Sequence, residues 1–282
     1  MLSAYGNDGS KYIACETNKG EMDFYCSQCK SIVILKKGSK KVHHFAHKPP
    51  VDCIYSENES DTHYKCKQDI YLALKTREDC INVDCEKDLG KIRADVYWEN
   101  LKGEKFAIEV QKSSISTDYI KYKMTRYKEL GIYVIWLLPS MLSTAKREAR
   151  DTDNKNNNIN LVKPLEWHKY LHKLYFGKLY IWCGNLDIQV IHLDSYIYYI
   201  ESGNWVDESD ISTETNWYQD NYDRGHYGGH PKFSKSKKVA KTYNKTLNLV
   251  NDFSSSKQRK NIKFDTIDCL LLNDRIRSFW KQ

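Results

Sequence analysis

The chain has 282 residues, of which 40% are hydrophobic and 29% are charged, and its formal net charge is +7. This length suffices for one large domain or two modest ones, and the positive charge favours a polyanionic partner such as nucleic acid. The longest apolar run, Val134 to Leu138, is far shorter than the roughly 20 residues that cross a bilayer. We therefore expect no membrane partner.

The cysteines and the N-terminus indicate the compartment. Nine cysteines are unevenly spread along the chain, and an odd number argues against a disulfide framework and fits a reducing compartment. The first residues have neither the basic start nor the apolar segment of a secretory signal. These features predict a cytoplasmic protein.

A Cys-x2-Cys motif stands near the N-terminus, before a short apolar strand and a cluster of histidines. Two thiolates at this spacing can share a tetrahedral Zn2+ whose other two ligands come from the His/Cys cluster. The motif also occurs as a pair of ordinary small residues, but the clustered histidines favour a structural zinc site. One possible ligand set is Cys26, Cys29, His47 and Cys53, and His44 or His43 can replace either of the last two.

A helix is predicted to start near residue 60, where Ser60, Asp61 or Thr62 can cap it. His63 and Lys67 stand four residues apart and therefore share one face of that helix. Glu59 precedes the helix and joins them in a polar set that is able to face the end of a sheet. A solvated helix face is the alternative interpretation.

Two predicted strands follow, Arg93 to Trp98 and Phe106 to Gln111, joined by a polar connection that suits a hairpin. Pairing them brings Asp95 and Glu109 to the same region of the sheet. Two carboxylates in such apolar strands are costly unless a cation lies between them, and Mg2+ or Mn2+ is the expected ion. In the alternative, both side chains point to solvent from the polar face of the sheet.

The remaining elements complete an α/β pattern. A strand over residues 81–86 precedes the hairpin, and a helix over residues 116–130 leads into a fully apolar strand over residues 132–138. The expected order is therefore helix, three strands, helix, strand. Beyond it we predict a helix over residues 165–176, a hairpin over residues 178–193, and a lysine-rich stretch between Lys232 and Lys245 that is either a solvated face or a phosphate-contacting arm.

Several of these elements together resemble the competence protein CoiA-like family. The resemblance covers roughly residues 1 to 200, and its most specific parts are the strings His44-Phe-Ala-His47 and Glu109-Val-Gln111-x-Ser113. Further matching elements are the Cys26-x2-Cys29 motif, the helix with Glu59, His63 and Lys67, the strand Arg93-Ala-Asp95-Val, Arg126 with Tyr127, and the strand that starts at Tyr133.

The resemblance implies a nuclease with a restriction-endonuclease-like PD-(D/E)xK core, active on DNA in natural transformation or in bacterial defence. The αβββαβ order is what such a core requires. The lysine that usually stands two residues after the metal-binding glutamate is Gln111 here, as the family pattern also has it. Gln111 cannot act as a charged stabiliser or a base, so a water that it positions, or that the metal activates, must do that work.

The resemblance also implies roles for single residues. Asp95 and Glu109 would bind Mg2+ or Mn2+, with the backbone carbonyl of Val110 as a possible third ligand, and the ion would polarise the phosphate and activate water. Gln111 would orient that water. Glu59 would be an outer-shell carboxylate or a ligand of a second metal ion, and His63 would be a proton shuttle. Lys67 or Arg126 would bind the phosphate and stabilise its developing negative charge.

The expected organisation has four parts. Residues 1–56 form a small β domain with the zinc site, residues 57–140 the nuclease core, residues 141–200 an extension, and residues 201–282 a basic region of unknown role. A metal-dependent DNA nuclease is the leading hypothesis. The alternatives are a non-catalytic DNA-binding adaptor and a zinc-stabilised interaction module of a defence complex that binds a protein partner through residues 201–282.

Overall fold

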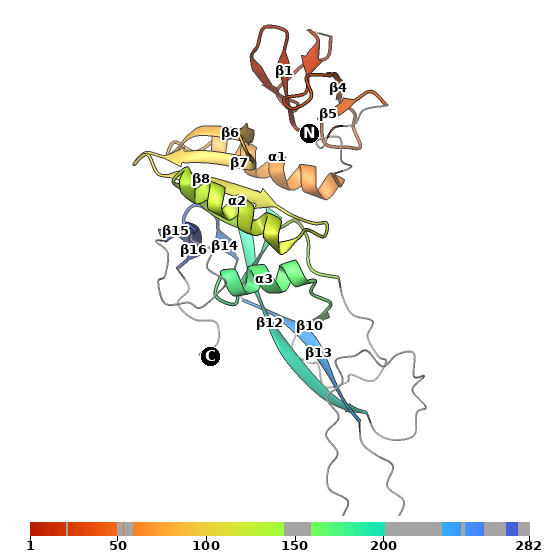
Figure 1. Cartoon of the computed structure of the whole chain (residues 1–282), viewed down its shortest axis with the longest axis vertical. Helices are drawn as coiled ribbons and strands as arrows, with labels where there is room; N and C mark the ends of the chain where they lie inside the picture. Colours follow the sequence, from red (N-terminus) through yellow and green to blue (C-terminus); the bar gives the residue numbers. More distant parts are fainter. Residues whose placement is uncertain are drawn as a thin grey trace, which may run out of the picture.

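The structure is a computed structural model of the chain, and it describes residues 1–20, 22–49, 53, 59–143, 159–200, 233–243, 246–256 and 269–275. The described strands form two sheets, a small one near the N-terminus and a large mixed one. Figure 1 shows the small sheet at one end of the molecule and, at the other, a long ribbon made of β12 (Asp187–Ile200) and β13 (Phe233–Thr242). The strands β7 (Arg93–Asn100) and β8 (Lys105–Val110), which carry Asp95 and Glu109, lie between these two ends.

The N-terminal sheet has the strand order β2-β1-β3-β4-β5, and every pair in it is antiparallel. It has a core of its own, because alternate residues of the apolar strand, Val33 and Leu35, point inward against Phe24 and Phe45. The predicted small β domain is therefore confirmed. Its strands are β1 (Ser3–Gly6), β2 (Lys11–Ile13), β3 (Phe24–Tyr25), β4 (Ile32–Lys36) and β5 (His44–His47).

The next six elements have the predicted αβββαβ order. The strands β6, β7 and β8 are antiparallel neighbours, and β9 continues the sheet in parallel with β8. As expected for a central strand, nearly all of β9 is buried. The elements are α1 (Asp61–Lys75), β6 (Cys80–Asp88), β7 (Arg93–Asn100), β8 (Lys105–Val110), α2 (Thr117–Glu129) and β9 (Ile132–Leu138).

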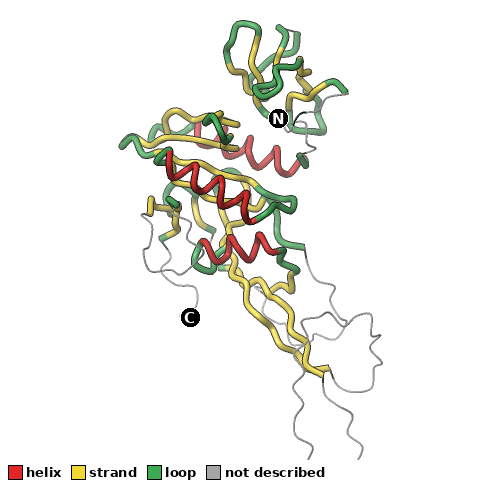
Figure 2. Tube along the Cα trace, in the orientation of Figure 1, coloured by secondary structure: helices red, strands yellow, loops and turns green. Residues whose placement is uncertain are grey.

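Local signals place the two helices of this core. Ser60 caps α1 by accepting from the backbone N–H of His63, and Ser116 caps α2 in the same way. Gly131 follows α2 with φ +67°, a conformation that glycine adopts without strain. The helix α1 packs on β6 and β7, while α2 packs on β9. Figure 2 shows that the helices lie between the N-terminal sheet and the ribbon.

The C-terminal half of the chain extends the same large sheet. Its path is β10-β13-β12-β11-β9-β8-β7-β6, and β16 pairs in parallel with β9 through Leu271 and Val134. The predicted hairpin is confirmed, but β12 runs on to Ile200 instead of ending at Leu193, because β13 pairs with it. The remaining elements are β10 (Ile159–Val162), α3 (Glu166–Leu174), β11 (Leu179–Gly184), β14 (Leu247–Asn248), β15 (Phe253–Ser256) and β16 (Leu271–Asp274).

Parts of the lysine-rich and tail segments lie outside the described residues. Between Lys232 and Lys245 the structure describes the β13 backbone and the side chain of Lys241, whose Nζ lies 2.8 Å from Oδ2 of Asp194. The predicted phosphate contacts of the other lysines, and residues 201–232, fall outside it. Among the described helices, none combines the length and apolar character of a membrane span.

Candidate active site and metal centre

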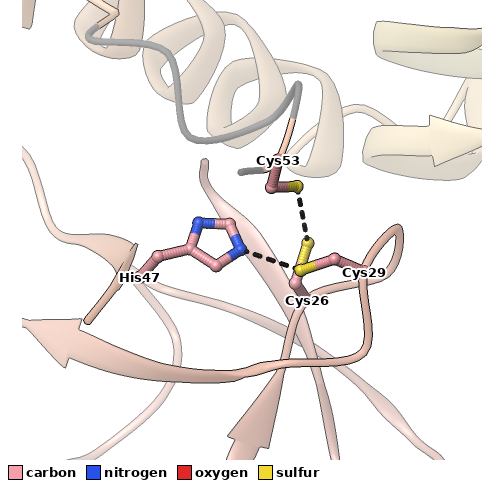
Figure 3. A group of neighbouring side chains, drawn as sticks. All are labelled: Cys26, Cys29, His47 and Cys53. Carbon is pink, nitrogen blue, oxygen red and sulfur yellow. Dashed lines mark hydrogen bonds between the residues drawn. The ribbon is translucent and has the colours of Figure 1, made fainter. Parts of the chain in front are cut away.

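The N-terminal domain brings together two thiols from the turn after β3, the imidazole at the end of β5, and Cys53 (Figure 3). The ligand atoms of Cys26, Cys29, His47 and Cys53 all lie within 4.8 Å of one another. The Sγ atoms of Cys26 and Cys53 are 3.9 Å apart, and Sγ of Cys29 is 3.3 Å from Nε2 of His47. Two thiolates bound to one tetrahedral zinc lie about 3.8 Å apart, so this donor set fits Zn2+.

The thiols of this cluster differ in acidity. Hydrogen bonds from Ser31, and to a lesser degree from His47, lower the pKa of Cys29 to about 6, so this thiol is largely ionised at neutral pH. Burial raises the pKa of Cys26 to about 11. His44 lies elsewhere, since its Nδ1 is 2.8 Å from the carbonyl of Val42 and its ring stacks on Tyr64. The structure thus gathers one of the predicted ligand sets and leaves His44 outside it.

A second group of possible ligands lies where α1 meets the strand β7. Glu59, His63 and Asp95 each offer one atom, and these atoms lie within 4.8 Å of one another. Nε2 of His63 is 3.7 Å from Oδ2 of Asp95, and this nitrogen is buried with no hydrogen-bond partner. A buried, unpartnered nitrogen between two carboxylates suits a cation ligand, because burying such an atom without a partner is costly.

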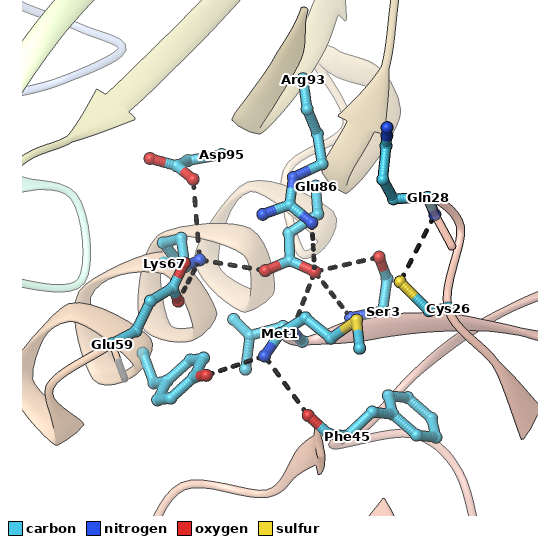
Figure 4. A network of polar contacts seen from close by, with 12 residues as sticks. Met1, Ser3, Cys26, Gln28, Phe45, Glu59, Lys67, Glu86, Arg93 and Asp95 are labelled. Atoms are coloured by element: carbon cyan, nitrogen blue, oxygen red, sulfur yellow. Dashed lines mark hydrogen bonds and ion pairs between the residues drawn. The ribbon is translucent and has the colours of Figure 1, made fainter. Parts of the chain in front are cut away.

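Lys67 lies one helical turn after His63 and is completely buried. Its Nζ is 2.6 Å from Glu59, 3.0 Å from Glu86 and 3.6 Å from Asp95 (Figure 4). Burial lowers the pKa of Lys67, but the three carboxylates more than offset this and raise it well above its usual value. Lys67 therefore stays charged and is shared among three acids.

Asp95 and Glu109 lie beside each other across the β7–β8 pair. The register that pairs Val96 with Ile108 continues to place Asp95 opposite Glu109, and the backbone N–H of Val110 donates to Oδ2 of Asp95 at 2.8 Å. Burial raises the pKa of Asp95, but Lys67 and His63 outweigh it and hold that pKa well below its usual range. Asp95 is therefore an ionised carboxylate, as a metal ligand must be.

Glu109 has its own partners, which come from α2. Lys123 places Nζ 2.6 Å from Oε2, and the hydroxyl of Tyr127 donates to Oε1. Lys123 also donates to the carbonyl of Arg93 at 3.0 Å. Burial raises the pKa of Glu109, and Lys123 offsets this only in part. The sequence analysis expected a metal ion to supply positive charge between the two acids, but lysines of the chain supply part of that charge.

The network contains four carboxylates and three side-chain cations, and the N-terminal ammonium of Met1 lies near Glu86. A mixture of carboxylate oxygen and imidazole nitrogen, as in Glu59, Asp95 and His63, suits Mn2+ as well as Mg2+. The acids are Glu59, Glu86, Asp95 and Glu109, and the cations are Lys67, Arg93 and Lys123.

Two predicted residues lie apart from this network. The side-chain amide of Gln111 donates to the backbone carbonyl of Ser113 at 2.8 Å, beyond the end of β8. Arg126 lies on an outer side of α2, where its guanidinium pairs with Glu129 at 2.5 Å and covers the ring of Tyr122. The structure thus brings together Glu59, His63, Lys67 and Asp95, places Glu109 beside them, and leaves Gln111 and Arg126 outside.

Sequence reasoning assigned no role to four members of the network, one of which is Arg93 on β7. Lys123 and Tyr127 stand four residues apart on the buried side of α2, and a lysine at a buried position of a helix was a signal that could have found them. Glu86 carried no such signal, since a polar residue in a strand is ordinary. Its role depends on contacts with the N-terminal strand β1, which lies far away in the sequence.

Known proteins give the following matches. Residues 8–56 match the family model described as the N-terminal domain of competence protein CoiA, and residues 59–215 match the one described as its nuclease-like domain. The curated "Competence protein CoiA" of Bacillus subtilis (strain 168) is 30% identical over 116 residues, which span 41% of this chain and 31% of that protein. No solved structure matches the chain.

Proposed function

Because the chain belongs to the competence protein CoiA family, with the nuclease-like domain over more than half of its length, we propose that it is a metal-dependent nuclease that hydrolyses DNA phosphodiester bonds. One observation carries this proposal: an ionised Asp95 lies beside Glu59 and the unpartnered Nε2 of His63. The biological setting that we propose is DNA processing in transformation or recombination, or defence against phage.

Asp95 is the central ligand in this proposal. Glu59 and His63 approach it from α1, and Glu109 lies opposite it on β8. Both oxygens of Glu109 accept from side chains of α2, but a carboxylate has further lone pairs for an ion. When bound, Mg2+ or Mn2+ would neutralise phosphate charge and lower the pKa of a water that attacks phosphorus.

The lysines supply the charge that Gln111 cannot. Lys123 holds its ammonium beside Glu109, and Lys67 holds a second ammonium beside Asp95. Fixed positive charges in a partly dry site stabilise the negative charge that develops on a phosphate during hydrolysis. We therefore assign this task to Lys123, with Lys67 keeping the carboxylates in place.

Cleavage by the purified full chain tests the proposal. Linear, circular and single-stranded DNA are incubated with Mg2+ or Mn2+, and we expect cleavage that Asp95→Asn or Glu109→Gln reduces by at least about 100-fold. Asp69→Asn is the matched control, because Asp69 lies on the same helix as His63 but pairs with Lys65 instead. DNA binding without cleavage in either metal would overturn the nuclease function.

A non-catalytic DNA-binding adaptor is the second candidate. It is favoured by the internal neutralisation of the site, since Asp95 and Glu109 each have a lysine within 3.6 Å and 2.6 Å respectively. An adaptor would bind DNA equally well in the intact protein and in Asp95→Asn, and neither would cut. A partner-binding role for residues 201–282 is a further proposal. It is tested by replacing residues 201–232 with a short Gly/Ser linker, which keeps the paired strands β13 and β16, and asking whether cleavage survives.

We also propose that the N-terminal cluster holds one structural Zn2+. Four donors are already assembled, which leaves no open position for a substrate and is typical of structural zinc sites. The ion would cross-link the turn after β3, the end of β5 and Cys53. Its role is to hold the N-terminal sheet together, which has only a small core of its own.

A further inference from the structure

Glu86 joins the N-terminal domain to the acidic site. Its side chain is buried, and its Oε2 accepts from the backbone N–H groups of Leu2 and Ser3, both at 2.9 Å, and from the hydroxyl of Ser3 at 3.1 Å. Its Oε1 accepts from Nζ of Lys67 at 3.0 Å (Figure 4). One carboxylate therefore connects β1 of the first domain with α1 of the second.

The backbone at Glu86 is adapted to this task. Its φ of +54° lies in the left-handed region, which is unfavourable for a residue with a Cβ atom. Cys85 and Lys87 keep their pairing with Val96 and Ala94 across β7, so the distortion is confined to one residue. The same register places Glu86 directly across from Asp95. A local strain that aims one carboxylate at a buried lysine indicates a specific role for that contact.

Glu86 also influences how Lys67 divides its hydrogen bonds. An ammonium has three donors, and those of Lys67 reach Glu59 at 2.6 Å and Glu86 at 3.0 Å, while Asp95 remains at 3.6 Å, beyond a hydrogen bond. Without the charge of Glu86, attraction would draw Lys67 toward Asp95. The lysine would then compete with a metal ion for the charge of Asp95, through the oxygen Oδ1 that now lies 3.6 Å from its Nζ.

We propose that Glu86 is a positioning residue that holds Lys67 away from Asp95 and so keeps Asp95 available to a metal ion. This inference rests on the proposed function, because it assumes that Asp95 binds the ion. It gives the N-terminal domain a part in the site, since the backbone N–H groups of Leu2 and Ser3 hold the carboxylate of Glu86 in place. The second domain alone would lack these three hydrogen bonds.

Metal affinity tests the inference without any need for catalysis. We would titrate the full chain with Mn2+ and follow free Mn2+ by electron paramagnetic resonance, for the intact protein and for Glu86→Gln. Glutamine keeps the shape and an acceptor oxygen but removes the charge. We expect Mn2+ to bind roughly tenfold more weakly, because the attraction between Lys67 and Asp95 is strong at a buried site.

A mutant cycle separates this effect from a loss of structure. Lys67→Gln removes the competing ammonium, so adding Glu86→Gln to it should weaken Mn2+ binding no further. Asp274→Asn is the matched control, because Asp274 is another buried acid paired with a lysine, Lys178, and makes no contact with Glu86 or Lys67 among those described. If Glu86→Gln does not fold, Ser3→Ala removes one of the three donors without a change of charge, and we expect a smaller shift in the same direction.

The outcomes distinguish the inference from the function beneath it. The inference alone would be overturned if Glu86→Gln and the intact protein bound Mn2+ equally well. It would also be overturned if Glu86→Gln weakened Mn2+ binding as much in the Lys67→Gln variant as it does in the intact protein. If the intact protein neither bound Mn2+ nor cut DNA, the proposed function and the inference would both fall. Unchanged folding and Mn2+ binding in Asp274→Asn, with weaker binding in Glu86→Gln, would support the role of Glu86.

Discussion

The N-terminal cysteine cluster and the acidic site both gather side chains that can bind a metal ion, but they do so in different ways. The cluster offers three thiols and one imidazole, which come from the turn after β3, the end of β5 and Cys53, with four ligand atoms within 4.8 Å of one another. The acidic site offers three such atoms and surrounds them with its own cations, among them the fully buried Lys67. A complete, soft set of ligands suits an ion that stays, whereas an incomplete set with internal cations suits an ion that shares the site with a substrate.

The difference lies in what replaces the ion. In the acidic site, Lys67 and Lys123 keep the carboxylates satisfied when no metal is bound. Folding of the second domain is therefore expected to be independent of a divalent ion. None of the four ligand residues of the cysteine cluster is a lysine or arginine that could neutralise the thiolates without a metal ion. The N-terminal domain is therefore expected to depend on zinc for its folding. The predictions below test this contrast.

The largest effect is expected from Cys26→Ser. Structural zinc supplies on the order of 10 kcal/mol or more to the folding of small domains, so loss of one buried ligand should release the ion and unfold the N-terminal sheet. Zinc content by mass spectrometry and the limited-proteolysis pattern measure both consequences. We expect one zinc per chain in the intact protein and rapid cleavage within residues 1–56 of the variant.

Cys183→Ser is the matched control for this experiment, because Cys183 is an exposed thiol of β11 outside the cluster. It should keep the zinc and the proteolysis pattern of the intact protein. If Cys26→Ser also kept both, the assignment of a structural zinc would be wrong, and the two sites would not differ as described above.

The next largest effect is expected from Lys67→Met. This change leaves Glu59, Glu86 and Asp95 without the ammonium that they share, and breaking a buried ion pair on one side typically costs about 3–5 kcal/mol. Urea unfolding at pH 7 measures the loss in the free energy of unfolding. Lys65→Met, on an exposed side of the same helix, should cost less than about 0.5 kcal/mol. Equal losses in the two variants would show that Lys67 does not hold the acids together.

Much of this arrangement could be predicted from the sequence, because it depends on local signals. Apolar periodicity and the caps Ser60 and Ser116 locate the helices, and the Cys-x2-Cys spacing locates two members of the cysteine cluster. The alternation of the strands places Asp95 and Glu109 together. The helix signals lie within a few residues of the helix ends that they predict, whereas the cysteine cluster and the acid pair also need short-range pairing of neighbouring strands.

The rest depends on contacts between distant segments. The pairing of Leu271 with Val134 and the bonds from Leu2 and Ser3 to Glu86 join parts of the chain that no local pattern links. No local pattern predicts the partner of Glu109 either, which is Lys123. The nearby Gln111 turns away to Ser113, and the lysine comes from the next helix instead. Which side chain fills such a place is decided by packing, and sequence spacing alone does not reveal it.

A third prediction separates the two cations of α2. Lys123→Gln should reduce the rate of DNA cleavage by roughly 100- to 1,000-fold, because it removes a preorganised charge beside Glu109. Arg126→Gln should reduce it less than about threefold, since Arg126 pairs with Glu129 at the surface. Steady-state kinetics, with thermal unfolding as a check on folding, measures both. If Arg126→Gln reduced the cleavage rate as much as Lys123→Gln, the role in binding phosphate that the sequence predicts for Arg126 would be supported over the assignment to Lys123.

The smallest effect concerns the loss of folding stability at low pH that comes from a single histidine, His168. This residue lies outside the cysteine cluster and the acidic site, on α3, and burial lowers its pKa from 6.5 to about 4. Its Nδ1 accepts from the backbone N–H of Leu165 at 3.0 Å, which requires the neutral ring. Between pH 6.5 and 4 the unfolded chain therefore binds a proton that the folded chain does not. Stability from this group is complete above pH 6.5 and falls as the pH drops toward 4.

His168→Asn keeps an acceptor near the same place and cannot titrate, so it isolates this contribution. We expect the difference in unfolding free energy between the intact protein and the variant to shift by on the order of 2 kcal/mol between pH 7 and pH 4, in favour of the variant at low pH. Urea unfolding at several pH values measures it. A difference that stayed constant with pH would show that His168 has the same pKa in the folded and the unfolded chain, which would contradict this prediction.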